Sequence, residues 1–161
     1  MIADRIRQFR HAGGHPVAAD FDLARQWLAA PLMALFEAQH PRDVVHSAET
    51  ARWLLERGHE DPDLIAAGLL HDIGKGEQRR LDRTVYVLAS HARLAPRLAA
   101  SASKFELRRA VARTLTHSET GAFALEMAGA SGRVVELTLR HHQAAGDDRV
   151  LALLQQADAA S

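Results

Sequence analysis

The chain of 161 residues contains no cysteine. This absence excludes disulfides, thiolate metal ligands and cysteine nucleophiles, so any chemistry must use nitrogen and oxygen donors. The sequence also lacks an apolar run close to the roughly 20 residues of a membrane span, and its first residues carry arginines instead of the apolar core of a signal peptide. We therefore expect a cytoplasmic protein without a membrane partner.

An excess of charge of either sign is missing as well. Twenty Lys and Arg residues stand against 20 Asp and Glu residues, for a formal net charge of +0. Such a balance gives no long-range attraction to a nucleic acid polymer, so no such partner is expected and any anion site must be local. The sequence gives no indication of an oligomeric state.

Alternating, strand-like patterns are scarce, and apolar residues recur at helical spacing almost throughout. We predict an all-α fold, a compact orthogonal array of helices in a single domain over 1–161, in which N-terminal helices in 1–39 pack on a core formed by 40–161. Residues 20–29 and 31–38 form either two helices or one kinked helix. The expected helices lie near 2–11, 20–29, 31–38, 41–57, 61–71, 82–98, 104–115, 117–127, 132–143 and 148–157.

Histidine is abundant, with ten residues in the chain. His71 falls on the same helical face as Leu64, Ala67 and Gly68, so its side chain should point toward the core. Asp72 follows directly, and a buried carboxylate is unfavourable unless it is paired or bound to a cation. The run LLHDIGK therefore suggests a buried ionic site at the end of a central helix.

Further polar residues share faces with apolar ones on other expected helices. Asp158 continues the stripe of Val150 and Leu154, and His141 continues that of Val134 and Leu137. The remaining candidates are His142 beside His141, His117 at an expected helix start after Thr116, and His46 at the edge of an apolar stripe. Imidazoles and carboxylates brought together in this way suit a divalent metal.

His46, the adjacent pair His71-Asp72, the late Asp158 and above all the run HDIGK resemble the HD-domain superfamily of metal-dependent phosphohydrolases. The resemblance covers roughly residues 40–161. It implies an all-helical fold with a metal at its centre, held by the positions that match His46, His71, Asp72 and Asp158.

Some members of this superfamily carry two further histidines that bind a second metal, with the aspartate of the pair as a bridge. His117 and His141 match those positions, so the resemblance favours two ions over one ion with these histidines as substrate contacts. His142 could replace His141 as a ligand or bind a phosphate. The donor set favours Fe or Mn, and Zn, Co or Ni would also fit.

The predicted function is hydrolysis of a small phosphate ester or nucleotide, monoester or diester, by metal-activated hydroxide. Asp72 would hold the ions together, and Lys75, on a turn that Gly74 and Gly76 allow, would donate charge-assisted hydrogen bonds to the phosphate. The run HHQAAGDDRV lacks the Gly-Tyr-Pro signature of the members that hydrolyse cyclic dinucleotides, so that substrate is not supported. Two alternatives are a dinuclear-iron oxygenase of the same superfamily and a non-catalytic regulatory module that binds metal or nucleotide.

Overall fold

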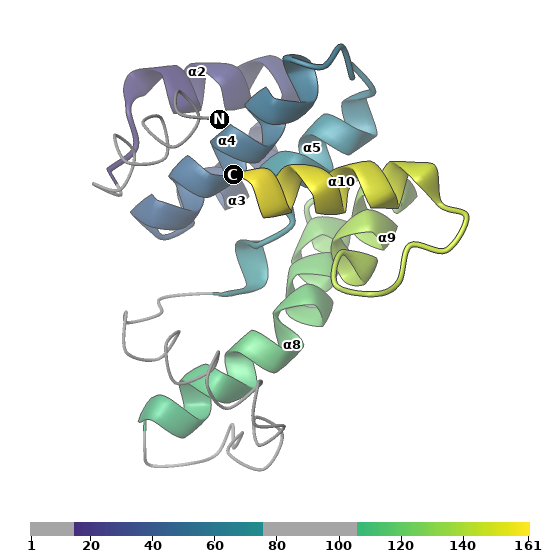
Figure 1. The fold of residues 1–161 in the computed structure, drawn as a ribbon. Helices are drawn as coiled ribbons and strands as arrows, with labels where there is room; N and C mark the ends of the chain where they lie inside the picture. The colour runs from purple at the N-terminus through teal and green to yellow at the C-terminus, as the bar shows by residue number, and fades with distance from the viewer. Residues whose placement is uncertain (1–14, 76–105) are drawn as a thin grey trace.

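The computed structural model describes residues 15–75 and 106–161, with the backbone alone for 106–116. These residues form seven α-helices and one short 3-10 helix, and they contain no strand, which confirms the all-α prediction (Figure 1). The helices predicted near 2–11 and 82–98 lie outside the described residues. The elements are α2 (Ala18–Trp27), α3 (Ala30–Glu37), α4 (Pro41–Leu55), α5 (Pro62–Leu70), η1 (Ile73–Lys75), α8 (Glu106–Met127), α9 (Gly132–Arg140) and α10 (Arg149–Ala160).

The helices that carry the first candidate ligands begin and end where the sequence predicts. Pro41 and Pro62 each occupy a first-turn position, where the missing N–H costs nothing. The Asp61 carboxylate caps α5 by accepting hydrogen bonds from the backbone of Asp63 at 2.9 Å and Leu64 at 3.0 Å. Gly58, with φ +78°, follows the end of α4.

Helix α5 lies at the centre of the molecule. All residues from Leu64 to Leu70 are buried, and the helix packs against α2, α3, α4, α9 and α10. Each fully buried leucine stabilises the fold by about 1.5–3 kcal/mol, so this helix is fixed by its surroundings on most sides. Its C-terminal end delivers the next two residues, His71 and Asp72, into the interior with 0% and 2% exposure.

Helices α2 and α3 are two separate helices, not one kinked helix. Leu28 between them is extended, with φ −112° and ψ 129°, and Pro31 lies in the first turn of α3. The buried Asp20 carboxylate forms an ion pair with Arg52 and so joins α2 to α4.

The two helices predicted at 104–115 and 117–127 are a single continuous helix, α8. The prediction that His117 begins a helix was therefore wrong. Thr116 and Ser118 look like capping residues, but no glycine or proline interrupts the chain there, and the helix continues through them. His117 lies within α8, about one turn before Gly121.

A network of charged side chains holds the end of α9 beside the start of α10. The Asp148 carboxylate caps α10 by accepting from the Leu151 backbone at 3.1 Å, and it accepts from Arg133 at 2.6 Å and Arg140 at 3.3 Å. Glu136 accepts from both arginines at 2.8 Å. The Arg140–Asp148 contact thereby joins the two ends of the loop that carries His141.

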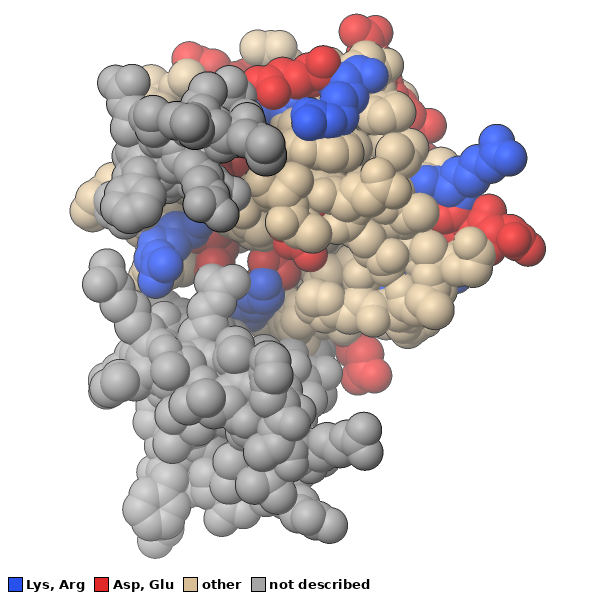
Figure 2. Space-filling model, in the orientation of Figure 1, with Lys and Arg blue, Asp and Glu red and all other residues tan. Residues whose placement is uncertain are grey.

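Lys and Arg side chains are interspersed with Asp and Glu over the visible face, and within the described part of that face no large patch of one sign gathers (Figure 2). This distribution agrees with the balanced composition. Among the described helices, none combines the length and apolar character needed to cross a bilayer.

Candidate metal centre

The first group of candidate ligands comes from three helices that pack together, α4, α5 and α10. His46 on α4 places Nε2 2.9 Å from Oδ1 of Asp158 on α10. His71, at the end of α5, places Nε2 3.4 Å from the same Asp158 oxygen. Residues 112 positions apart in the chain therefore meet at one point, as the sequence predicts.

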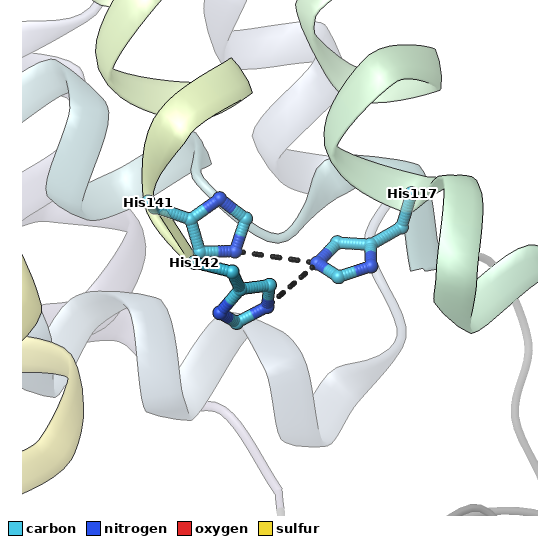
Figure 3. Close-up of side chains that lie close together, drawn as sticks. All are labelled: His117, His141 and His142. Carbon is cyan, nitrogen blue, oxygen red and sulfur yellow. Dashed lines mark hydrogen bonds between the residues drawn. The ribbon is translucent and has the colours of Figure 1, made fainter. Parts of the chain in front are cut away.

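The second group consists of His117 from α8 and the adjacent pair His141 and His142 that follows α9 (Figure 3). Nε2 of His117 lies 3.2 Å from Nε2 of His141 and 3.2 Å from Nε2 of His142. His117 and His141 are each 2% exposed, whereas His142 is exposed to solvent. Both histidines of the pair thus face His117, and their equal distances do not distinguish His141 from His142 as the ligand that acts with His117.

Asp72 lies between the two groups and turns one oxygen toward each. Its Oδ2 is 3.5 Å from Nε2 of His71 and 3.8 Å from Nε2 of His46. Its Oδ1 is 3.7 Å from Nε2 of His117 and 3.7 Å from Nε2 of His141. A single buried carboxylate therefore contacts both sets of imidazoles, the arrangement required of a ligand shared by two cations.

The spacing and the buried polar atoms fit a divalent cation in each group. Donors that bind one cation at about 2.1 Å lie roughly 3.0–3.5 Å from one another, close to the separations within each group. Within the described part of the chain, His71 Nε2 and Asp72 Oδ1 are buried without a hydrogen-bond partner. Such groups are costly to bury unless something binds them, and a cation would satisfy both.

Backbone carbonyls orient two of the rings toward the centre. Nδ1 of His71 donates to the Gly68 carbonyl at 3.0 Å, and Nδ1 of His141 donates to the Thr138 carbonyl at 2.6 Å. A carbonyl can only accept, so Nδ1 of each ring carries a proton and Nε2 is the atom that faces the centre. The sequence could have suggested these partners, since each carbonyl lies three residues before its histidine on a helix.

The charges of the first group favour a cation. Burial by itself would lower the pKa of His71, but the carboxylates of Asp72 and Asp158 outweigh it and raise that pKa above its ordinary value. Burial opposes ionisation of Asp72 and Asp158 as well, yet neighbouring imidazoles, with Lys75 at Asp72, hold the pKa of each carboxyl below its usual range. Two ionised carboxylates therefore meet where a positive charge would be stabilised.

The histidine pair of the second group, His141 and His142, is held in the neutral form. Burial, followed by the proximity of His71 and His142, lowers the pKa of His141 to about 3. Burial also lowers the pKa of His142. Neutral imidazoles keep their lone pairs available, which is the form that binds a metal.

Lys75 ends η1, and its ammonium contacts Oδ2 of Asp72. The side chain is 16% exposed, so the charge lies at the edge of the centre. Gly74 lies in the 3-10 turn of η1, in which the Lys75 N–H donates to the Asp72 carbonyl at 3.0 Å, and its φ lies outside the left-handed region. Gly76 lies outside the described residues.

Two supporting contacts were not predicted from the sequence. The Thr50 hydroxyl bonds the His46 carbonyl at 3.0 Å and the Ser161 hydroxyl at 2.8 Å, which ties α4 to the end of α10. The Gln155 amide donates to the His141 carbonyl at 3.0 Å and so ties the end of α9 to α10. These contacts join distant segments, so no local pattern signals them.

All the predicted ligands converge on Asp72, and Lys75 and His142 lie at the edge of the same cluster. Their roles as ligands or substrate contacts remain predictions.

The family model described as "HD domain" matches residues 38–161. The chain therefore belongs to the HD superfamily of metal-dependent phosphohydrolases, and the resemblance seen in the sequence is confirmed. No curated protein and no solved structure matches the chain.

Proposed function

We propose that this chain is a phosphohydrolase that cleaves a small phosphate ester or nucleotide with the help of two divalent cations, Fe or Mn being favoured. The observation that carries the proposal is the placement of the Asp72 carboxylate, with Oδ2 toward His46 and His71 and Oδ1 toward His117 and His141. Membership of a superfamily made up mostly of metal-dependent phosphohydrolases supports it.

Two divalent cations held by these residues would supply a water of lowered pKa as the nucleophile and would neutralise charge on the non-bridging phosphate oxygens. The protein's own contribution is positioning. Asp72 fixes the spacing between the two groups, and the carbonyls of Gly68 and Thr138 hold the rings of His71 and His141 in place. Because these side chains lie in short turns directly after the ends of packed helices, little reorganisation is needed at the moment of reaction.

Lys75 and His142 are the residues proposed to contact the phosphate. The Lys75 ammonium lies against Asp72 at the edge of the centre, and a phosphate beside the cations would receive its charge-assisted hydrogen bonds. His142 is solvent-exposed while its Nε2 faces His117, so it can meet a substrate that arrives from outside. Both groups would stabilise the charge that develops on the phosphoryl oxygens.

The test is elemental analysis of the purified protein, followed by a screen of nucleotides and model phosphomonoesters and phosphodiesters with added Mn²⁺ or Fe²⁺. We expect release of phosphate or of the ester's alcohol that depends on the added metal and is abolished by His71→Ala. Metal-replete protein that is inert across the screen would overturn hydrolysis in favour of a regulatory binding module. Consumption of dioxygen by the iron-loaded protein without phosphate release would instead indicate an oxygenase.

A further inference from the structure

The backbone of Gly74 lies directly against a peptide of α8 that belongs to a candidate ligand. A Cβ built on Gly74 would lie 1.9 Å from the carbonyl oxygen of His117, 2.7 Å from its carbonyl carbon and 2.8 Å from the backbone nitrogen of Gly121. All three atoms belong to backbone, which cannot rotate out of the way as a side chain can. Only glycine fits this position.

The contact is completed from the other side by Gly121. A Cβ on Gly121 would lie 3.3 Å from the Gly74 nitrogen, 3.4 Å from Cγ1 of Ile73 and 3.5 Å from Cγ2 of Thr138. Thr138 is the residue whose carbonyl orients His141. The two glycines therefore lie where α8, η1 and α9 meet, and Figure 1 shows η1 beside α8.

Each of these three elements supplies or orients a part of the second ligand group. Helix α8 carries His117, η1 follows directly after Asp72, and α9 leads to His141. We infer that the Gly74–Gly121 backbone contact is a positioning element that sets the distance between the His117 ring and the shared carboxylate of Asp72, and so governs binding of the second cation. The inference rests on the proposed two-cation site, but not on the identity of the substrate.

The size of the effect follows from the distances. For Gly74→Ala, the gap to the His117 carbonyl must open by about 1.5 Å, from 1.9 Å to the 3.4 Å at which ordinary van der Waals contact begins. Metal–ligand distances tolerate about 0.2 Å, so His117 would leave the second site. The first group belongs to α4, α5 and α10, so its cation should remain.

Gly121→Ala should disturb the contact between the two glycines less than Gly74→Ala does. Its closest contact is 3.3 Å, which neighbouring atoms relieve by a shift of a few tenths of an ångström. We expect the second cation to bind about tenfold more weakly, the lower end of the range for supporting residues. Alanine favours a helix interior more than glycine does. If Gly121 had a purely structural role, Gly121→Ala would therefore raise the melting temperature and leave metal binding unchanged.

The experiment measures the number of bound Mn²⁺ ions and their dissociation constants for the wild type, Gly74→Ala, Gly121→Ala and Gly132→Ala. Gly132 is the matched control, because a Cβ there meets nothing within 4 Å. We expect two ions for the wild type and the control, one for Gly74→Ala with the electron paramagnetic resonance spectrum of an isolated Mn²⁺, and a weakened second ion for Gly121→Ala. Circular dichroism of the metal-free proteins checks that each is folded.

Two tightly bound ions in a folded Gly74→Ala protein would overturn the inference and leave the proposed hydrolase intact. If Gly74→Ala does not fold, Gly121→Ala decides: a weakened second ion supports the positioning role, and an unchanged one refutes it. A wild type that binds a single ion would overturn both the two-cation site and this inference. Failure to find a phosphoester substrate has no bearing on these ion counts.

Discussion

Because the Asp72 carboxylate contacts both groups of ligands, its substitution should affect the binding of both cations, whereas substitution of a residue in one group should affect only one. In Asp72→Asn the shape of the side chain is kept, but one unit of negative charge is lost from both groups. At about 4 Å and an effective dielectric constant of about 20, Coulomb attraction to that charge is worth about 8 kcal/mol to a divalent cation, so each dissociation constant should rise by more than about a thousandfold. We therefore expect the number of tightly bound ions to fall from two to none.

Single-site variants should behave differently. Asp158 contacts His46 and His71, so Asp158→Asn should release the first ion and leave the second. His141 lies with His117, so His141→Ala should release the second ion and leave the first. Asp147→Asn is the control, because Asp147 is solvent-exposed and directly precedes the structural residue Asp148.

The assay is elemental analysis after Mn²⁺ loading and gel filtration, with calorimetric titration for the dissociation constants. Asp72→Asn protein that is folded and still binds two ions with unchanged affinity would refute the bridging role. Equal loss of both ions in Asp158→Asn would show that the two groups are not separate sites.

Three further predictions follow from other contacts. Lys75→Gln should keep both ions and lower kcat by about a hundredfold, since it removes a charged hydrogen-bond donor to the phosphate; unchanged kcat would exclude the clamp. Asp148→Asn should lower the free energy of unfolding by about 1 kcal/mol at pH 7, because Arg133 holds the Asp148 pKa at about 2 and this stabilisation exists only where the carboxyl is ionised. The difference between Asp148→Asn and the wild type in urea unfolding should shrink as the pH falls from about 4 to 2, and a difference independent of pH would contradict the assignment. Thr50→Val should lower the melting temperature by roughly 2–4 °C through loss of its bond to Ser161, and Ser161→Ala combined with it should add little more; fully additive losses would show that the two hydroxyls act separately.

Many of the helices could be predicted from the sequence because the residues that begin and end a helix act on their near neighbours. Pro41, Asp61 and Pro62 mark helix starts by chemistry that acts within one turn, and the apolar run of α5 indicates a buried helix without knowledge of its neighbours. The same locality explains the error at His117. Thr116 resembles a capping residue, but a helix stops there only if a helix-breaking residue is nearby, and the stretch on either side of Thr116 contains no proline or glycine before Gly121.

The candidate site was predictable where helical phase and the family motif coincide, as at His71, Asp72 and Asp158. The parts that sequence did not give are contacts between residues far apart in the chain. The Thr50–Ser161 bond spans 111 positions, and the approach of Gly74 to Gly121 depends on how α8 crosses η1. Gly74 was predicted to allow a turn, and it does lie in the turn η1, but the close packing that its missing side chain permits was not foreseen.

A carboxylate that serves two positions prevents them from filling independently. On the proposed arrangement, the position beside His46 and Asp158 has a second carboxylate of its own, whereas the position beside His117 has neutral imidazoles and only a share of Asp72. The first position would fill early, and the second would fill last and empty first when metal is scarce. Turnover would then follow the supply of free cation through the weaker position, while the stronger one stayed occupied.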